Sequence, residues 1–299
     1  MTSSTDHPIP PRALVLLAII TLVWGTNWPL FPYAVREVSV WTFRAFGVSL
    51  AGATLLLVAW ARGESLAIAR EHWPKIGTAT LFYLVWWNIT STYAALLIPS
   101  GQAAILGFTM PLWSALISWA VLGERLTGRM LLAVALGGAG VTLLMVPSLA
   151  AYAKAPLGFA LGLSAGLGWA IGTLILKRAK VRTSALVLTG WQLLACAVPL
   201  TIGAFAFGDG QWFVPSWPSI AIITYIALVP MCIGNLCWFA IVGLLPANVA
   251  GVSSILVPVV AMIAGALIHG EPLGPLQWLA MLCCVGALAL VLLQPARKA

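Results

Sequence analysis

The side chains best suited to binding a small molecule in this chain are tryptophans that lie deep inside long apolar stretches. They are Trp24, Trp28, Trp86, Trp87, Trp113, Trp169 and Trp191. An indole combines a large apolar ring with one N–H group, and that group needs a partner or a wet cavity when it is buried. Lipid-facing or interhelical packing is the alternative for any one of them. As a group they favour a cavity for a ligand with an apolar body.

Asparagines supply polar chemistry at the same depth. Asn27, Asn88 and Asn235 lie inside apolar stretches, and Tyr83 lies close to Asn88. An amide left in hydrocarbon is costly, so these side chains must face other helices or water. A hydrogen bond between helices contributes about 0.6 kcal/mol on average in membranes. Interhelical packing and ligand binding or gating therefore both remain open for Asn88 and Asn235.

The two asparagines Asn88 and Asn235 belong to an internal repeat. Residues 88–126 align with residues 235–273 without a gap. The matching pairs include Asn88 with Asn235, Leu97 with Leu244, Pro99 with Pro246, Ala103 with Ala250, Pro111 with Pro258, Gly123-Glu124 with Gly270-Glu271, and Leu126 with Leu273. With a slip of two residues, Trp24 also corresponds to Trp169. Hydrophobicity alone would not place these prolines, asparagines and carboxylates, so we predict two related halves.

The elements that carry these residues are predicted to be membrane-spanning helices. Hydrophobic residues make up 62% of the 299 residues and charged residues 7%, and the mean hydropathy is +1.03. Each apolar stretch reaches about the 20 residues that a helix needs to cross the hydrocarbon core. Ten stretches can be marked, at about 13–34, 38–60, 74–97, 100–122, 129–146, 156–176, 184–206, 217–241, 247–268 and 273–294.

The distribution of Lys and Arg predicts the orientation of these spans. With a cytoplasmic N-terminus, the outer side carries only Arg36 and Lys154. The inner side then carries Arg12, Arg62, Arg70, Lys75, Arg125, Arg129, Lys177, Arg178, Lys180, Arg182, Arg297 and Lys298. Both termini are therefore predicted to be cytoplasmic, and halves of five spans each must be inverted with respect to one another. The net charge of +8 reflects this orientation and not nucleic-acid binding.

Apart from Lys75 and Arg129 at span ends, Arg44 is the only charged residue within the predicted spans. Outward snorkelling is the favoured interpretation of this residue, and pairing with a helix end or a substrate carboxylate is the alternative. No Asp, Glu or His lies in the middle of a span, so no proton relay is evident. A neutral or zwitterionic substrate fits better than a cation, and movement down the substrate gradient is expected. The five cysteines lie in apolar stretches without a nearby His, which favours packing over metal binding or a disulfide.

Proline and glycine mark the expected moving and packing positions. Pro111 and Pro258 occupy matching places, and each should delete a backbone hydrogen bond and act as a hinge. Gly158, Gly162 and Gly166 form a ridge that lets another helix approach closely. Gly123 and Gly270 are expected to end helices as structural corners, each followed by a glutamate.

The paired Gly-Glu corners, the ten spans and the Trp-Gly-x-Asn-Trp run from Trp24 to Trp28 resemble the EamA-type exporters of the drug/metabolite transporter superfamily. Within that family, the abundance of Trp and Tyr in spans one, three and six resembles the bacterial exporters of aromatic and other neutral amino acids. The resemblance implies a basket of ten helices, with spans 1, 3, 4, 6, 8 and 9 around a central cavity and spans 5 and 10 at the periphery.

We therefore predict an all-α integral membrane protein that exports neutral, aromatic or hydrophobic amino acids across the cell inner membrane by alternating access. Export of other amphipathic metabolites or drugs is the alternative, and an integral-membrane enzyme is a third class that the short loops, nearly free of Asp and His, disfavour. No cofactor, nucleic acid or obligate protein partner is expected. The predicted regions are a tail (1–12), a first repeat (13–146), an outer linker (147–155), a second repeat (156–294) and a tail (295–299). The predicted substrate-binding residues are Trp24, Asn27, Tyr83, Trp87, Asn88, Phe108, Trp169 and Asn235.

Overall fold

The fold is all-helical throughout the part of the chain that the structure, a computed structural model, describes. The described residues are 10–98, 100–123, 127–146, 149–208, 214–245, 254–270 and 273–292. No strand occurs among them. Seven helical segments in these ranges are long and apolar enough to cross a membrane, and two shorter apolar helices, 254–268 and 275–290, follow near the C-terminus.

The helices up to residue 154 come first. They are α1 (Pro11–Asn27), η1 (Trp28–Leu30), α2 (Phe31–Ala34), α3 (Val40–Ala61), η2 (Arg70–His72), α4 (Trp73–Thr80), η3 (Leu81–Trp86), α5 (Trp87–Leu97), α6 (Ser100–Gly107), α7 (Met110–Leu122), α8 (Gly128–Met145) and α9 (Leu149–Lys154). The predicted outer linker is thus partly helical, because α9 lies within it.

The remaining helices follow from residue 156. They are α10 (Pro156–Ala179), α11 (Ala185–Phe207), α12 (Trp217–Ile226), η5 (Ala227–Gly234), α13 (Asn235–Leu244), η6 (Ser254–Leu256), α15 (Val257–His269) and α16 (Pro275–Leu292). Elements η3 and η5 are π-helices, and η1, η2 and η6 are 3₁₀ helices.

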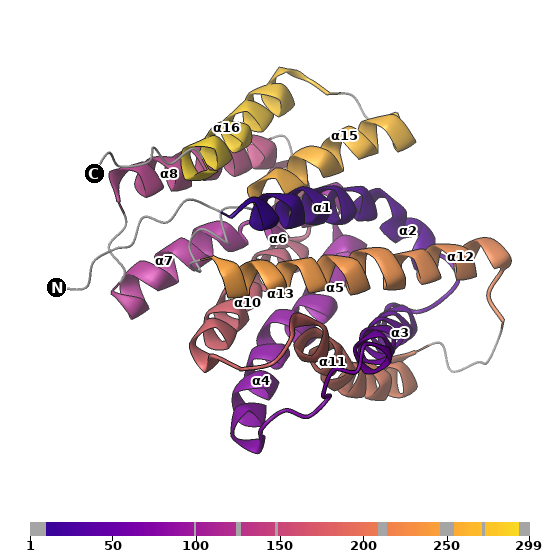
Figure 1. Cartoon of the computed structure of the whole chain (residues 1–299). Helices are drawn as coiled ribbons and strands as arrows, with labels where there is room; N and C mark the ends of the chain where they lie inside the picture. The colour runs from indigo at the N-terminus through magenta and orange to yellow at the C-terminus, as the bar shows by residue number, and fades with distance from the viewer. Residues whose placement is uncertain are drawn as a thin grey trace, which may run out of the picture.

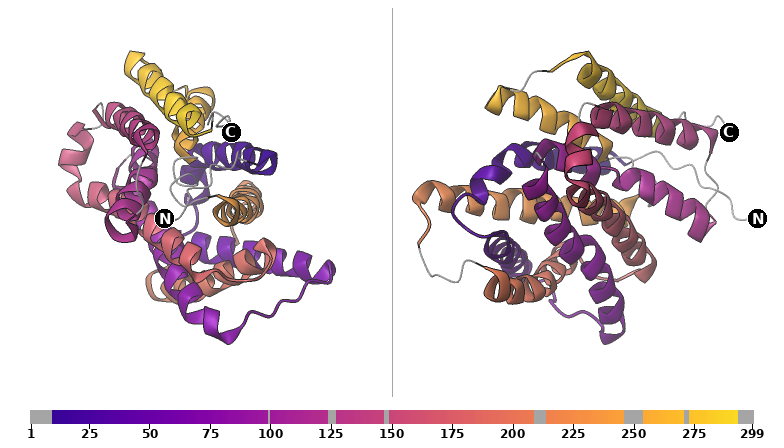
Figure 2. Two further views of the ribbon diagram at one scale, coloured as in Figure 1. Left: turned by 60° about the vertical axis from the view of Figure 1, so that its left-hand side comes forward. Right: turned by 180° about the vertical axis from the view of Figure 1, so that it is seen from behind.

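Helices from the two halves of the sequence pack against one another in pairs. Helix α3 packs along α11, and α8 packs along α16. Helix α10 contacts η3, α5 and α7, while α1 contacts η5, α13 and α15. Figure 1 shows the α8–α16 pair at the top and α4 with α11 at the bottom, with α1 and the α12–α13 segment across the middle. The views of Figure 2 keep α16 (yellow) at the top and α11 toward the bottom.

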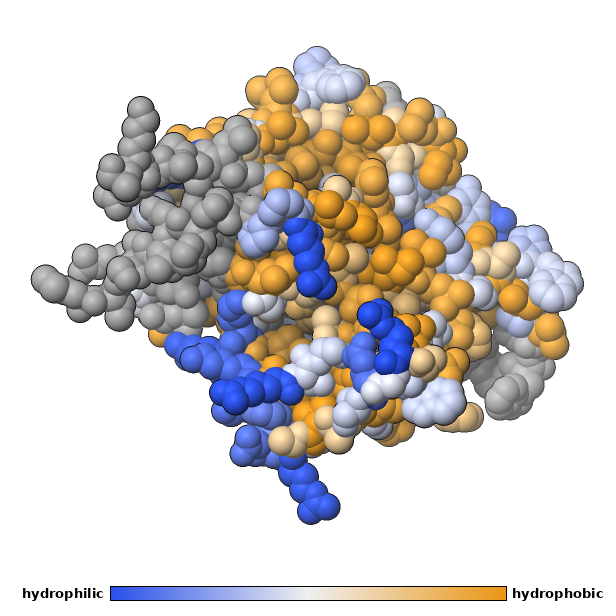
Figure 3. Space-filling view, viewed as in Figure 1, coloured by the Kyte–Doolittle hydropathy of each residue, from blue (hydrophilic) through white to orange (hydrophobic). Residues whose placement is uncertain are grey.

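The molecular surface is largely apolar, as a lipid-facing protein requires. Figure 3 shows hydrophobic side chains over most of the described face, with hydrophilic ones gathered mainly over its lower part, near the ends of α4 and α10. Large hydrophobic side chains such as Leu267 and Trp217 are more than 80% exposed. In water this exposure would drive aggregation. The protein is therefore a multi-pass membrane protein.

Two helices are interrupted by π turns just before an asparagine. The Asn88 helix consists of α4, η3 and α5, and the Asn235 helix consists of α12, η5 and α13. The offset that aligns Asn88 with Asn235 carries residues 81–86 of η3 onto 228–233, inside η5. Short π segments within α-helices occur frequently at functional sites. Both π turns therefore direct attention to the region around the asparagines.

The two prolines with a predicted hinge role do not delete hydrogen bonds. Pro111 is the second residue of α7, after a break at Phe108 and Thr109, and Pro258 is the second residue of α15, after η6. At that position a backbone N–H has no partner within the helix, so proline costs nothing there. The chain is interrupted as expected, but the interruption precedes each proline instead of being a kink around it.

The glycines at helix ends and on α10 have the predicted structural roles. Gly123 and Gly270 end α7 and α15 with φ of 65° and 69°, the left-handed conformation that favours glycine. Their partners Glu124 and Glu271 lie outside the described residues. On α10, a Cβ at Gly162 would lie 2.8 Å from the Cβ atom of Leu106, so this face packs at backbone distance.

Candidate functional site

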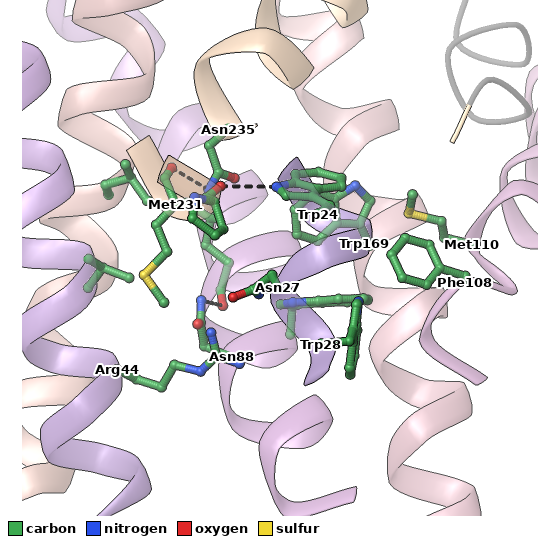
Figure 4. A pocket seen from close by; sticks show the side chains of 15 residues that line it. Trp24, Asn27, Trp28, Arg44, Asn88, Phe108, Met110, Trp169, Met231 and Asn235 are labelled. Carbon is green, nitrogen blue, oxygen red and sulfur yellow. Dashed lines mark hydrogen bonds between the residues drawn. The ribbon is translucent and has the colours of Figure 1, made fainter. Parts of the chain in front are cut away.

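A cavity of about 70 Å³ lies where the two interrupted helices meet α1, α3, α10 and α11. Figure 4 shows the side chains around it. The lining residues are Trp24, Asn27, Trp28, Arg44, Val48, Leu84, Trp87, Asn88, Phe108, Met110, Trp169, Leu193, Pro230, Met231 and Asn235. The structure thus brings together every predicted site residue except Tyr83.

One wall of this cavity is a cluster of aromatic rings. The ring centre of Trp169 lies 5.3 Å from that of Trp24 and 4.9 Å from that of Trp87, both edge to face. Trp238 packs 5.8 Å from both Trp24 and Trp169. Edge-to-face pairs of this kind add about 0.5–1.5 kcal/mol beyond the burial of their area. The wall is therefore held by ring-to-ring contacts as well as by hydrophobic burial.

Tyr83 lies behind this wall and not in the cavity lining. Its side chain is fully buried, and its ring centre lies 6.0 Å from that of Trp169 and 5.1 Å from that of Phe239. Its helix position explains this, because Tyr83 and Leu84 are adjacent and so project in different directions. Leu84 lines the cavity instead. Tyr83 supports the ring that a ligand would touch.

The two asparagines make the same contact in the two interrupted helices. Asn88 Nδ2 donates to the carbonyl of Leu84 at 2.8 Å, and Asn235 Nδ2 donates to the carbonyl of Met231 at 2.7 Å. Both carbonyls belong to π turns, where the regular α-helical hydrogen bonding is interrupted. Each amide thus satisfies a backbone group of its own π turn. Asn88 Nδ2 also lies 4.0 Å from Cys196 Sγ of α11, and both asparagines line the cavity.

A tryptophan of α1 makes a further contact with the π turn of η5. Trp24 Nε1 donates to the carbonyl of Pro230 at 3.0 Å. A Cβ atom at Gly234 would lie 2.3 Å from the same Nε1, so only glycine leaves room for this ring. The Trp24 ring is therefore fixed in the wall by its hydrogen bond to Pro230 and by contacts with the rings of Trp169 and Trp238.

Arg44 lies inside the protein, and the expectation that it snorkels outward is wrong. Its side chain is only 6% exposed, and it lines the cavity. Arg44 Nε donates to Thr92 Oγ1 at 3.1 Å, and that hydroxyl donates to the Asn88 carbonyl at 2.5 Å. A buried guanidinium is costly unless it is hydrogen-bonded, and this polar chain in α5 supplies part of what it needs. The signal was present in the sequence as the run Thr90-Ser91-Thr92.

Several polar atoms around the cavity lack a protein partner among the described residues. They are Trp169 Nε1, Asn27 Oδ1 and Asn235 Oδ1, all of which are buried. A buried polar atom without a partner costs free energy, so each is suited to a water molecule or a polar ligand atom. They include both donors and acceptors. The cavity can therefore bind a ligand that has both kinds of group.

The cavity is small for a ligand site in this structure. Its volume is about 70 Å³. Pockets that bind drug-sized molecules measure about 300–1,000 Å³. An amino acid with an aromatic side chain therefore enters only when the rings or the interrupted helices move apart.

The Asn235 helix is attached to its neighbours by a charged side chain at each end. At its start, Glu37 Oε2 accepts from the backbone N–H of Ser216 at 2.7 Å, and Glu37 Oε1 accepts from the Ser216 hydroxyl at 2.7 Å. These hydrogen bonds hold the pKa of the Glu37 carboxyl below its ordinary value. At its end, Lys177 Nζ of α10 donates to the carbonyls of Val242 and Leu245, at 2.6 and 2.7 Å. An anion at the N-terminus and a cation at the C-terminus both complement the helix dipole.

The lining residues that sequence reasoning did not select are mostly apolar. They include Val48, Leu84, Met110, Leu193, Pro230 and Met231. Nothing in their type separates them from lipid-facing residues of the same spans. Trp238 of the aromatic wall was also missed, although it follows Asn235 by three residues, a spacing that places both on one helix face.

Comparison with known proteins agrees with a transport protein. The profile of the EamA-like transporter family matches residues 11–146 and again residues 156–293. The "Uncharacterized transporter YvbV" of Bacillus subtilis is 26% identical over 265 residues, covering 88% of this chain and 85% of that one. The "Probable amino-acid metabolite efflux pump" of Escherichia coli is 27% identical over 282 residues, covering 89% of each chain.

A solved structure shares the fold. The chain described as "Crystal structure of protein" superposes with a TM-score of 0.77 at 20% sequence identity, over 93% of this chain and 95% of that one. This likeness concerns the fold alone. The family match, however, spans nearly all of the described helices, and the relatives are named as transporters and not as enzymes. The chain belongs to the EamA-like transporter family.

Proposed function

We propose that this chain is a secondary exporter of neutral amino acids with aromatic or other hydrophobic side chains, in the cell inner membrane. The observation that carries the proposal is the composition of the cavity wall, in which tryptophan rings adjoin amide groups. Apolar rings suit a hydrophobic side chain, and amide and indole groups suit the polar end of an amino acid. The name of the Escherichia coli relative, an amino-acid metabolite efflux pump, supports the same substrate class.

Other amphipathic metabolites are the second candidate. The same relative's name speaks of metabolites of amino acids, and an aromatic wall accepts many apolar bodies. Cationic drugs fit less well, because no acidic side chain lies among the lining residues of the described chain. Competition by free amino acids in a transport assay distinguishes the first two candidates.

The transport mechanism that we propose is alternating access by two inverted repeats, 13–146 and 156–294, in a ten-span arrangement. Three pairs of features support this proposal: the π turns η3 and η5, the left-handed glycines Gly123 and Gly270, and the packing of α10 on α5 and α7, matched by that of α1 on α13 and α15. Inverted repeats give two sides that can rock about a central site. Pro111 and Pro258, at the interruptions of their spans, are the proposed hinges.

The substrate proposal is tested with purified protein in lipid vesicles. Vesicles loaded with unlabelled L-tryptophan should take up labelled L-tryptophan by exchange without an imposed pH gradient. Trp169→Ala should slow this exchange at least tenfold, because the substrate loses its largest ring contact. Trp278→Ala, which removes a 54% exposed ring that is not part of the cavity lining, is the matched control. Equal losses of exchange in both variants would mean that the aromatic wall serves packing and does not bind substrate. Accumulation of substrate against its gradient, driven by a pH gradient, would overturn the expected movement down the substrate gradient.

The topology is tested separately. A cysteine at Lys154 should react with an impermeant thiol reagent added outside intact cells, whereas a cysteine at Arg178 should not. The expected result follows from the excess of Lys and Arg on the cytoplasmic side. The reverse pattern would overturn the proposed orientation, and reaction at both positions would overturn the inverted repeats.

A further inference from the structure

The cavity has two chemically different sides. Figure 4 shows Arg44, Asn88 and Asn27 on one side and the rings of Trp24, Trp28, Trp169 and Phe108 on the other. A ligand that fills both sides must have a polar end and an apolar end. The two sides therefore fix which way round it binds.

The polar side carries one charge, and that charge is positive. Among the lining residues of the described chain, Arg44 is the only charged side chain. The sequence also has no Asp or Glu within the predicted spans. In a low-dielectric site, an uncompensated cation on a ligand is strongly disfavoured beside a guanidinium, and an anion is favoured. The positive charge in the cavity thus favours amphipathic ligands that carry an anion over those that carry only a cation.

The structure positions Arg44 for such a contact. Its Nε atom is held by Thr92, which is itself anchored on the Asn88 carbonyl. A guanidinium has five donors in a planar fork, so it can keep this scaffold contact and still bind a carboxylate. Restraint of the side chain before binding also lowers the entropic cost of the contact.

We propose that Arg44 binds the carboxylate of the transported molecule and makes this site selective for aromatic monocarboxylates over aromatic amines. The proposal rests on the proposed function and deepens it by naming the group that is recognised. The amino group of an amino acid is left to neutral acceptors, of which Asn27 Oδ1 has no protein partner among the described residues. Hydrogen bonds between a charged donor and a charged acceptor are about twice as strong as neutral ones. The carboxylate therefore contributes more to affinity than the amino group does.

The unmodified protein provides the first test, with three ligands that share an indole ring. L-Tryptophan has both charged groups, indole-3-propionate has only the carboxylate, and tryptamine has only the amine. Isothermal titration calorimetry of the purified protein should give affinities in which indole-3-propionate remains within about tenfold of L-tryptophan. Tryptamine should bind at least about tenfold more weakly than both, as expected when a charged hydrogen bond is lost.

The outcomes separate this proposal from the proposed function. Equal binding of L-tryptophan and tryptamine would overturn the role of Arg44 and leave amino-acid export standing. Binding of indole-3-propionate without L-tryptophan would support Arg44 and overturn amino acids as the substrate. Binding of none of the three would overturn both.

Variants provide the second test. Arg44→Gln should weaken indole-3-propionate binding about ten- to hundredfold and leave tryptamine binding unchanged or stronger, because the repulsive charge is gone. Arg44→Lys should retain part of the carboxylate preference. Arg36→Gln, which removes an exposed guanidinium outside the cavity, is the charge-matched control and should change nothing. A parallel loss of all three ligands in Arg44→Gln would assign Arg44 to folding, and the proposal would fail.

Discussion

The Asn88 helix and the Asn235 helix have the same backbone irregularity but differ in the side chains around it. In both, a π turn precedes an asparagine that donates back to a carbonyl of that turn. After Asn88 come Thr90, Ser91 and Thr92, all buried and polar. After Asn235 come Cys237, Trp238 and Phe239, all buried and without a hydroxyl.

The ends of the two helices differ as well. The Asn235 helix is attached through Glu37 at its start and Lys177 at its end. The start of α4 in the Asn88 helix has no side-chain cap. The two helices therefore share the backbone geometry around the cavity but differ in the chemistry of their side chains.

The Asn88 helix carries the hydroxyl run that reaches Arg44 as well as Trp87 of the aromatic wall, whereas the Asn235 helix adds Trp238 to that wall and has no such run. A substrate therefore meets an asymmetric site between two helices of similar backbone geometry.

The largest effect should come from filling the space at the π turn of the Asn235 helix. Gly234→Ala forces a Cβ atom against the Trp24 indole and should lower the free energy of unfolding by about 1–3 kcal/mol. Gly243→Ala, in the same helix but with no atom within 4 Å, should raise it by about 0.5–1 kcal/mol. Thermal unfolding in detergent checks both. A stabilising Gly234→Ala would mean that Trp24 is not fixed as described.

Replacing the two asparagines tests whether the stability of the π turns and the ligand preference of the cavity can be changed separately. Asn88→Leu and Asn235→Leu each leave a π-turn carbonyl without its donor, so both should lose about 1 kcal/mol of stability. Only Asn88→Leu should also reduce the preference for indole-3-propionate over tryptamine, because Asn88 lies beside Arg44. Calorimetry on both variants measures this preference. An equal change in the two variants would contradict the division of chemistry between the helices.

The cationic cap of the Asn235 helix should have an effect on stability no larger than that of the asparagines. Lys177→Met removes two hydrogen bonds at the helix C-terminus and should cost about 1 kcal/mol. Arg178→Met is the matched control, since Arg178 is exposed and adjacent. Hydrogen–deuterium exchange should increase at residues 241–245 in the first variant alone. Unchanged exchange there would show that Lys177 does not hold this end.

The smallest effect concerns the anionic cap and depends on pH. The pKa of Glu37 is lowered by hydrogen bonds from the side chain and backbone of Ser216. A carboxyl whose folded pKa lies below its unfolded value stabilises the fold at higher pH, and the contribution is lost as pH falls from the unfolded value through the folded one. Amide exchange at the start of α12 should therefore increase on acidification below about pH 4.5, measured relative to an internal reference peptide. Glu37→Gln should abolish this pH dependence, and its persistence would assign it to another group.

Much of this arrangement could be predicted from the sequence, because it depends on rare residue types. Deep tryptophans and asparagines are costly in hydrocarbon, so Trp24, Trp169 and Asn88 had to face the interior. The apolar part of the cavity lining was not predictable, since Leu84 and Met231 are of the same residue types as lipid-facing residues. The π turns could not be predicted either, because they do not change the pattern of hydrophobic residues in the sequence. Arg44 was misplaced because snorkelling depends only on distance to the interface, whereas burial depends on Thr92, a partner in another helix.

The glycine face of α10 has a consequence for how this protein can vary over generations. Cβ atoms at Gly162, Gly166 and Gly172 would lie 2.8, 2.8 and 2.4 Å from their nearest neighbours, on α6, Gly107 and Tyr83. A side chain does not fit at these positions, and at Gly166 the obstructing atom is the backbone oxygen of Gly107, which no substitution opposite can remove. Gly77 and Gly128 have no atom within 4 Å and carry no such restriction. A side chain at Gly166 or Gly172 therefore requires α10 to move away from its neighbours, so the closeness of this helix contact itself restricts which residues these positions can hold.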